Sequence, residues 1–142
     1  MDQTHGADKP AHTVLHPAGW ARPRGYSNGI AATGKQVFVA GQIGWDEQCR
    51  LVSSDFAEQA RQALRNVVAV LKEAGAGPQH IARMTWYLTD KGEYLAAAKA
   101  IGQAYREIVG PHYPAMTAIQ VSALIEDGAK VEIEATAVVP TD

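Results

Sequence analysis

Two glutamates near the C-terminus are the side chains of this sequence best suited to acid–base chemistry. Glu132 and Glu134 stand in the run Lys130–Thr136, where polar and apolar residues alternate. A period of two is typical of a strand with one buried face, so both carboxylates fall on its polar face. A carboxylate there can position water or move a proton to a nitrogen. By residue pattern alone, a solvated strand face is the simpler interpretation.

Other single residues give weaker signals of a site. Trp45 stands beside Asp46 in a predicted loop, and an aromatic ring next to a carboxylate can form the edge of a pocket or cover the core. Gly41 lies inside an apolar run, where glycine permits close approach by a ligand or forms a bulge. Cys49 is the single cysteine, so an internal disulfide is excluded, and we interpret it as a loop thiol.

Several kinds of site find no support in the sequence. Metal-ligand spacing is absent among the histidines His12, His16, His80 and His112. No Ser-His-Asp order, phosphate-binding loop or Gly-rich dinucleotide turn follows a predicted strand. We therefore predict neither a metal site nor an organic cofactor.

The strands are predicted from alternation and from turn residues between them. They cover residues 13–16, 26–32, 36–42, 81–88, 114–120 and 130–139. Gly34 predicts a hairpin between the second and third strands, and Asp127-Gly128 predicts one between the last two. The last hairpin would bring Met116 and Ala118 on one strand beside Glu132 on its partner.

Two amphipathic helices are predicted between these strands. The first covers residues 55–74, with Asp55 as its cap and Glu58 three residues on. The second covers residues 93–109 and ends at Gly110-Pro111. Helices placed after runs of strands predict an α+β fold, in which a mixed sheet carries both helices on one face.

The other face of that sheet would then be apolar. We expect it to carry Tyr87, Met116, Ala118 and Val138, too much apolar surface to stay in water, so self-association is predicted. Residues 11–142 are predicted as one domain, and the polar residues 1–10 as a disordered tail.

The amino-acid composition limits the kinds of partner that the protein is expected to bind. The 142 residues are 46% hydrophobic and 20% charged, with a formal net charge of −2. Such a chain has no electrostatic attraction to nucleic acid, and no run is long and apolar enough to cross a membrane. A cytoplasmic protein is the expectation.

The C-terminal motifs resemble those of a known family. The run Tyr113-Pro114-Ala115-Met116-Thr117, followed by the strand around Glu132, is similar to the end of the reactive-intermediate deaminase family, RidA or YjgF, often named endoribonuclease L-PSP. Upstream, Tyr26, Gly41 and the phrase ending in Thr89-Asp90 extend the resemblance over most of the chain.

This resemblance implies a chorismate-mutase-like fold and a homotrimer with ligand pockets between subunits. It places Glu132 in the pocket as the catalytic residue, and it implies Tyr26, Gly41 and Met116 as substrate-binding positions. The residue pattern adds three further substrate-binding candidates: Ala118 on the strand of Met116, and Trp45 and Trp86 as aromatic contact area. The family has an arginine that holds the substrate carboxylate where this chain has Met116. A hydroxyl residue is replaced by Ala40, and an asparagine by Gly92.

Three functions follow as hypotheses. The first is hydrolytic deamination of an enamine or imine other than 2-aminoacrylate, because a thioether cannot hold a carboxylate. The second is a non-catalytic small-molecule-binding or regulatory trimer. The third and weakest is endoribonuclease activity, for which no basic patch is found.

Overall fold

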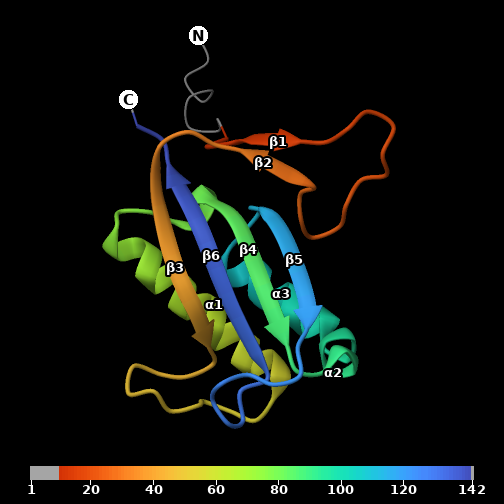
Figure 1. The fold of residues 1–142 in the computed structure, drawn as a ribbon, viewed down its shortest axis with the longest axis vertical. Coiled ribbons are helices and arrows are strands. Elements are labelled where there is room, and N and C mark those ends of the chain that lie inside the picture. The colour runs from red at the N-terminus through yellow and green to blue at the C-terminus, as the bar shows by residue number, and fades with distance from the viewer. Residues whose placement is uncertain (1–9, 142) are drawn as a thin grey trace.

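The computed structural model describes residues 10–141 and places a layer of helices behind a four-stranded sheet (Figure 1). The tail predicted at residues 1–10 lies, except for Pro10, outside the described residues. The elements in chain order are β1 (Thr13–Leu15), β2 (Gly29–Ala31), β3 (Lys35–Ile43), α1 (Phe56–Glu73), a 3-10 turn (Pro78–His80), β4 (Ile81–Leu88), α2 (Lys91–Ala96), α3 (Ala98–Ile108), β5 (Ala115–Gln120) and β6 (Val131–Val139).

The large sheet has the strand order β3-β6-β4-β5, and β1 pairs with β2 in a separate two-stranded sheet. Strands β4 and β5 run parallel, whereas β6 is antiparallel to both of its neighbours, so the sheet is mixed as predicted. Helices α1 and α3 lie against the same face of this sheet (Figure 1). The α+β class and the single helical layer are therefore confirmed.

The predicted hairpin between the last two strands is wrong. Strand β5 pairs with β4, and β6 lies between β3 and β4. The connection from β4 to β5 passes through α2 and α3, which is the crossover that parallel strands require. Strand β6 buries every second residue and bonds along both edges, which suits the centre of a sheet, whereas most of β5 is exposed and suits an edge.

The predicted hairpin around Gly34 is also wrong. The strand expected at residues 26–32 shortens to β2 and pairs with β1, while β3 pairs with β6. Gly34 has a different role, because a Cβ built on it would collide with the carbonyl oxygen of Val139 at the end of β6. Its φ of +150° also disfavours any residue with a side chain.

The first helix forms as predicted, and the second is divided. The carboxylate of Asp55 accepts a hydrogen bond of 3.0 Å from the Glu58 amide, which caps α1. The second helix starts at Lys91 instead of residue 93, because Asp90 caps it. It is interrupted at Ala97, whose ψ of 7° departs from the helical value, and continues as α3.

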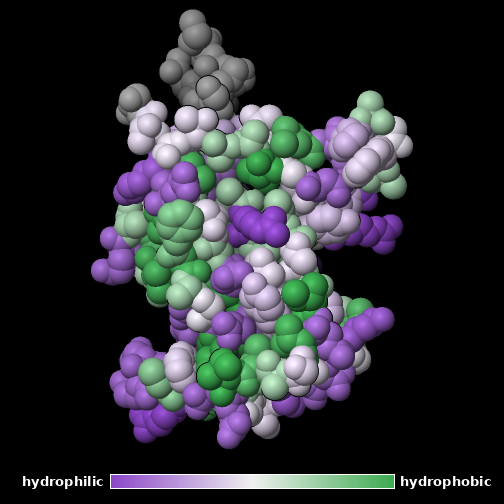
Figure 2. Space-filling model, viewed as in Figure 1, coloured by the Kyte–Doolittle hydropathy of each residue, from purple (hydrophilic) through white to green (hydrophobic). Residues whose placement is uncertain are grey.

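The open face of the sheet differs from the prediction. Met116 and Ala118 pair in register with Met84 and Trp86, so they point toward the helices, whereas Tyr87 lies on the open face as predicted. Val138 shares that face with Glu132 by the alternation of β6, but its side chain is buried. Figure 2 shows apolar and charged side chains intermixed on the side away from the helices. The large apolar residues exposed by this register are Phe38, 72% exposed, and Ile119, 43% exposed.

No helix within residues 10–141 combines the length and the apolar character that a membrane span requires.

Candidate functional site

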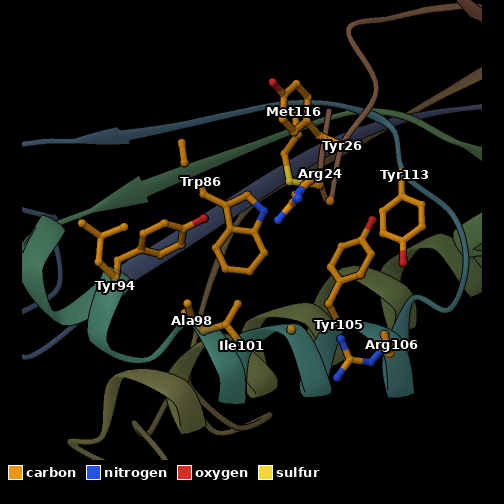
Figure 3. A pocket seen from close by; sticks show the side chains of 14 residues that line it. Arg24, Tyr26, Trp86, Tyr94, Ala98, Ile101, Tyr105, Arg106, Tyr113 and Met116 are labelled. Carbon is orange, nitrogen blue, oxygen red and sulfur yellow. The ribbon is translucent and has the colours of Figure 1, made fainter. Parts of the chain in front are cut away.

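A pocket of about 620 Å³ opens on the helical side of the sheet, beside strands β4 and β5. Helix α3 forms its floor, and the loop before β2 forms its rim (Figure 3). The space exists because small residues face it from both sides: Ala98 and Gly102 on α3, and Ala118 on β5. Larger side chains at these positions would close it.

Tyr26 reaches this pocket because the next residue anchors the rim loop to the start of β5. The Ser27 amide donates to the carbonyl oxygen of Pro114 at 3.0 Å, and the Ser27 hydroxyl donates to that of Tyr113 at 2.5 Å. The hydroxyl bond joins residues 86 positions apart in the sequence and is partly buried. Together the two bonds fix Tyr26 next to Met116 (Figure 3).

Aromatic rings form the walls. Tyr94 packs edge-on against Trp86, with ring centroids 6.3 Å apart, and Tyr105 stacks on Tyr113 at 5.7 Å. The Tyr105 hydroxyl donates to the carbonyl oxygen of His112 at 2.5 Å. Burial, together with the nearby Tyr113, raises the pKa of Tyr105, so this phenol stays neutral and acts as a wall, not as a base.

The pocket brings together a subset of the residues predicted from sequence. Tyr26, Trp86, Met116 and Ala118 all line it, although they come from the rim loop, β4 and β5. No aspartate or glutamate of residues 10–141 lines this pocket. One chain therefore supplies a mainly aromatic and apolar cavity, with Arg24 and Arg106 at its edges and without a carboxylate.

Glu132 lies on the opposite face of the same sheet. It pairs in register with Tyr87, whose neighbour Trp86 points toward the helices, so Glu132 and the pocket are separated by the sheet. Nearby, the Tyr87 hydroxyl donates to Glu134 at 2.5 Å, and this bond raises the pKa of Tyr87. The predicted proximity of Met116 and Glu132 across a hairpin is lost with that hairpin.

Gly41 belongs with Glu132, not with the pocket. A Cβ on Gly41 would collide with the Glu132 carboxylate, so the glycine leaves room for that side chain against β3. A register shift in the β3-β6 pairing lies between Val39 and Gln42, which agrees with the bulge considered for this position.

Trp45 does not line the pocket either. It follows β3, forms a bridge with Leu51, and its carbonyl oxygen accepts a bond of 2.9 Å from the Asn66 amide group. In the same loop, backbone bonds from Arg50 and Gln48 lower the pKa of Asp46. These contacts give the loop a structural role within this chain.

The histidines gather in a second depression of about 750 Å³, lined by His12, His80 and His112. The His12 ring bonds to the carbonyl oxygen of His80 at 2.9 Å, and the His80 ring accepts from the Gly77 amide. Burial, with His12 and His112 nearby, lowers the pKa of His80. Over residues 10–141, no cluster of three metal-binding side chains is found.

Sequence reasoning missed most of the pocket floor and its rim. Tyr94, Ile101 and Tyr105 lie in the second predicted helix, for which the sequence indicated an amphipathic pattern but no ligand contact, and Arg24 is not among the predicted substrate-binding residues. The sequence feature that could have indicated this pocket is the apolar stripe of that helix together with the small residues Ala98 and Gly102.

The mixed sheet, its helical layer and the pocket beside the Tyr-Pro-Ala motif define the class of this protein. Residues 20–139 match the sequence model of the Endoribonuclease L-PSP family, and the chain belongs to this family, also called RidA or YjgF.

Particular members extend the match. The human 2-iminobutanoate/2-iminopropanoate deaminase is 34% identical over 105 residues, 73% of each chain. A RutC family protein of Synechocystis is 36% identical over 118 residues, 82% of this chain and 87% of the relative. Among solved structures, the Rid family protein YyfB from Yersinia pestis has a TM-score of 0.81 at 30% identity, covering 91% of this chain and 99% of that one. Escherichia coli TdcF with bound serine has a TM-score of 0.64 at 32% identity, covering 90% and 99%.

Proposed function

We propose that this protein hydrolyses an imine or enamine intermediate derived from a substrate larger and more apolar than 2-aminoacrylate. Water adds to the imine carbon, and a proton moves to the nitrogen. The carbon–nitrogen bond then breaks, which releases ammonia and forms a carbonyl product. The human relative is named for this reaction on 2-iminobutanoate and 2-iminopropanoate. Membership of the same family supports this class of reaction. We also propose that the protein acts in the cytoplasm.

The observation that carries the proposal is the pocket around Met116. It brings Tyr26, Trp86 and Ala118 from separate elements to one cavity, at the position where the family's motifs predict a ligand. Its aromatic walls and its volume suit a ligand with a sizeable apolar group. A three-carbon imino acid would leave much of these walls uncovered.

Glu132 acts in this proposal from a neighbouring subunit. It is on the open face of the sheet, so it reaches no ligand in the pocket of its own chain, but a second copy packed on that face can receive it. The exposed Phe38 and Ile119 on the same face support such packing. We therefore propose a homotrimer in which Glu132 completes a pocket between subunits.

The assembly can be tested with a charged substitution. Phe38→Glu places a carboxylate in the proposed interface, and we expect it to reduce the trimer population strongly at micromolar concentration. The matched control is Val70→Glu, which changes a residue that is 40% exposed on helix α1. Multi-angle light scattering measures the mass, and a monomer mass for the unaltered protein would refute the trimer.

Substrate size gives a second prediction. Imines formed in situ by an amino-acid oxidase from phenylalanine and from alanine differ mainly in the aromatic group. We expect this protein to accelerate ammonia release from the phenylalanine-derived imine at least about tenfold more than from the alanine-derived imine, because only the former fills the aromatic walls. Equal acceleration, measured against enzyme-free reactions, would contradict the proposed preference.

A non-catalytic small-molecule-binding or regulatory trimer is the second candidate. It is favoured by the finding that no carboxylate of residues 10–141 lines the pocket of one chain. Tight binding of the carbonyl product, without accelerated ammonia release from any imine, would select this candidate. Endoribonuclease activity rests on the family's name alone, and the net charge of −2 gives it no support.

A further inference from the structure

Arg24 occupies a position that the family's motif does not predict. It stands on the rim loop, and its guanidinium points toward Met116 and Trp86 at one end of the pocket (Figure 3). Within residues 10–141, its guanidinium is not among the groups that form ion pairs. The loop that carries it is held in place by the two hydrogen bonds of Ser27. A positive charge is therefore presented to the pocket by an anchored backbone.

A second polar group points to the same end. Trp86 is only 3% exposed, and its ring nitrogen is buried without a hydrogen-bond partner among the described residues. Figure 3 shows this nitrogen on the edge of the ring that faces Arg24 and Met116. A buried N–H donor that lacks a partner costs free energy, which an acceptor on a ligand would recover.

We propose that Arg24 and Trp86 bind the carboxylate of the substrate, in place of the arginine that Met116 replaces. The guanidinium donates to one or both carboxylate oxygens, and the indole N–H donates to the nearer one. Met116 lies next to them and gives only apolar contact. This carboxylate site rests on the proposed function and names the class of substrate, which is a 2-imino acid with a large apolar side chain.

The remainder of the pocket fits the rest of such a substrate. From the carboxylate end, Tyr94, Ile101 and Tyr105 line the surface toward the helices, and all three contribute to the apolar core or pack against it. Arg106 also lines the pocket but lies beyond the Tyr105 ring (Figure 3). The cationic group nearest to Trp86 in this pocket is therefore that of Arg24, and the orientation of the ligand is defined.

The test compares two ligands that differ only in the carboxylate. Phenylpyruvate is the product of the phenylalanine-derived imine, and phenylacetone has a methyl group in place of its carboxylate. By calorimetry, we expect the unaltered protein to bind phenylpyruvate about 10- to 100-fold more tightly than phenylacetone. Arg24→Gln should remove most of this difference while leaving the affinity for phenylacetone unchanged.

Matched variants separate Arg24 from charge in general. Arg22→Gln alters the same loop outside the pocket, so it should keep the preference for phenylpyruvate. Trp86→Phe, which retains an aromatic ring but lacks the N–H, should lower the affinity for phenylpyruvate about threefold to tenfold more than the affinity for phenylacetone. Because Trp86 is buried, the thermal stability of the Trp86→Phe protein is measured as well, to show that the variant is folded.

The experiments test the carboxylate site and the deaminase activity separately. If Arg24→Gln keeps the full preference for phenylpyruvate, the carboxylate site is wrong, whatever the rate of deamination. If the preference disappears in Arg24→Gln but no imine is hydrolysed by the unaltered protein, the carboxylate site holds and the deaminase proposal fails. An unaltered protein that binds both ligands equally would also overturn the inference.

Discussion

Replacing Gln59 with leucine should lower the free energy of unfolding by about 3 to 5 kcal/mol. The Gln59 side chain is fully buried at the start of α1 and forms three hydrogen bonds to backbone groups. Its amide group donates to the carbonyl oxygens of Ser53 at 2.9 Å and Gly128 at 3.0 Å, and its oxygen accepts from the Lys130 amide at 2.8 Å. Leucine fills similar space but leaves all these groups without partners.

The position of these bonds makes the loss large. They join the loop before α1 to the loop that enters β6, two segments far apart in the sequence, and water cannot replace a partner inside the core. Gln103→Leu is the matched control, because Gln103 is exposed on α3 and bonds only to the exposed Glu107. The control should change the stability by less than about 0.5 kcal/mol.

Urea unfolding at one fixed protein concentration measures both variants, since an oligomer's stability depends on concentration. Equal midpoints for Gln59→Leu and Gln103→Leu would mean that the buried bonds contribute little. That result would also mean that these bonds do not stabilise the packing of α1 against the loop that leads into β6, the strand that carries Glu132.

The elements that local pattern defines could be predicted from the sequence. Helix α1 has a capping residue at Asp55 and a continuous apolar stripe, and the first seven of the nine residues of β6 alternate between buried and partly buried. These features depend on neighbours within a few positions. They therefore identify type and approximate bounds without any knowledge of the rest of the fold.

Strand pairing could not be predicted in the same way. Gly34 and Gly128 both lie at reversals of the chain, and the sequence shows the reversal but not the partner of the strand that follows. The central position of β6 depends on which edges remain free after β4 and α3 have packed, which is a property of the whole fold. Both predicted hairpins failed for this reason.

The error in pairing also governs the candidate site. Tyr26, Trp86, Met116 and Ala118 were predicted and do share one pocket. Glu132 was expected beside Met116, but antiparallel pairing of β6 with β4 puts it opposite Tyr87, on the other face. A change of strand partner reverses which side chains meet, even where each strand is predicted correctly.

Replacing Glu132 with glutamine should reduce kcat for imine hydrolysis by about 100-fold or more, because it removes the carboxylate that we propose to position water and move the proton. Binding of phenylpyruvate should change by less than about threefold, since the pocket of each chain is intact. The glutamine has nearly the same size and remains against Gly41, so the thermal stability should be retained.

The placement of Glu132 across the sheet from its own pocket predicts that it acts between subunits, and mixed trimers test this. Ala118→Trp fills the pocket from an exposed position on β5, so it should abolish activity without crowding the core. Chains carrying Ala118→Trp still present Glu132 to a neighbour, whereas chains carrying Glu132→Gln still have an open pocket. Each variant alone should be inactive.

Refolding the two variants together at equal amounts forms sites that combine an open pocket with an intact Glu132 from the next subunit. With random mixing in one direction around the trimer, about a quarter of the sites are complete, so about a quarter of the original activity should return. The control replaces the Ala118→Trp chain with one that carries Glu132→Gln as well, and it should restore nothing. If tagged subunits show that exchange has occurred and activity still does not return, Glu132 does not act on its neighbour's pocket. Full activity of the Glu132→Gln protein alone would exclude this carboxylate from the reaction altogether.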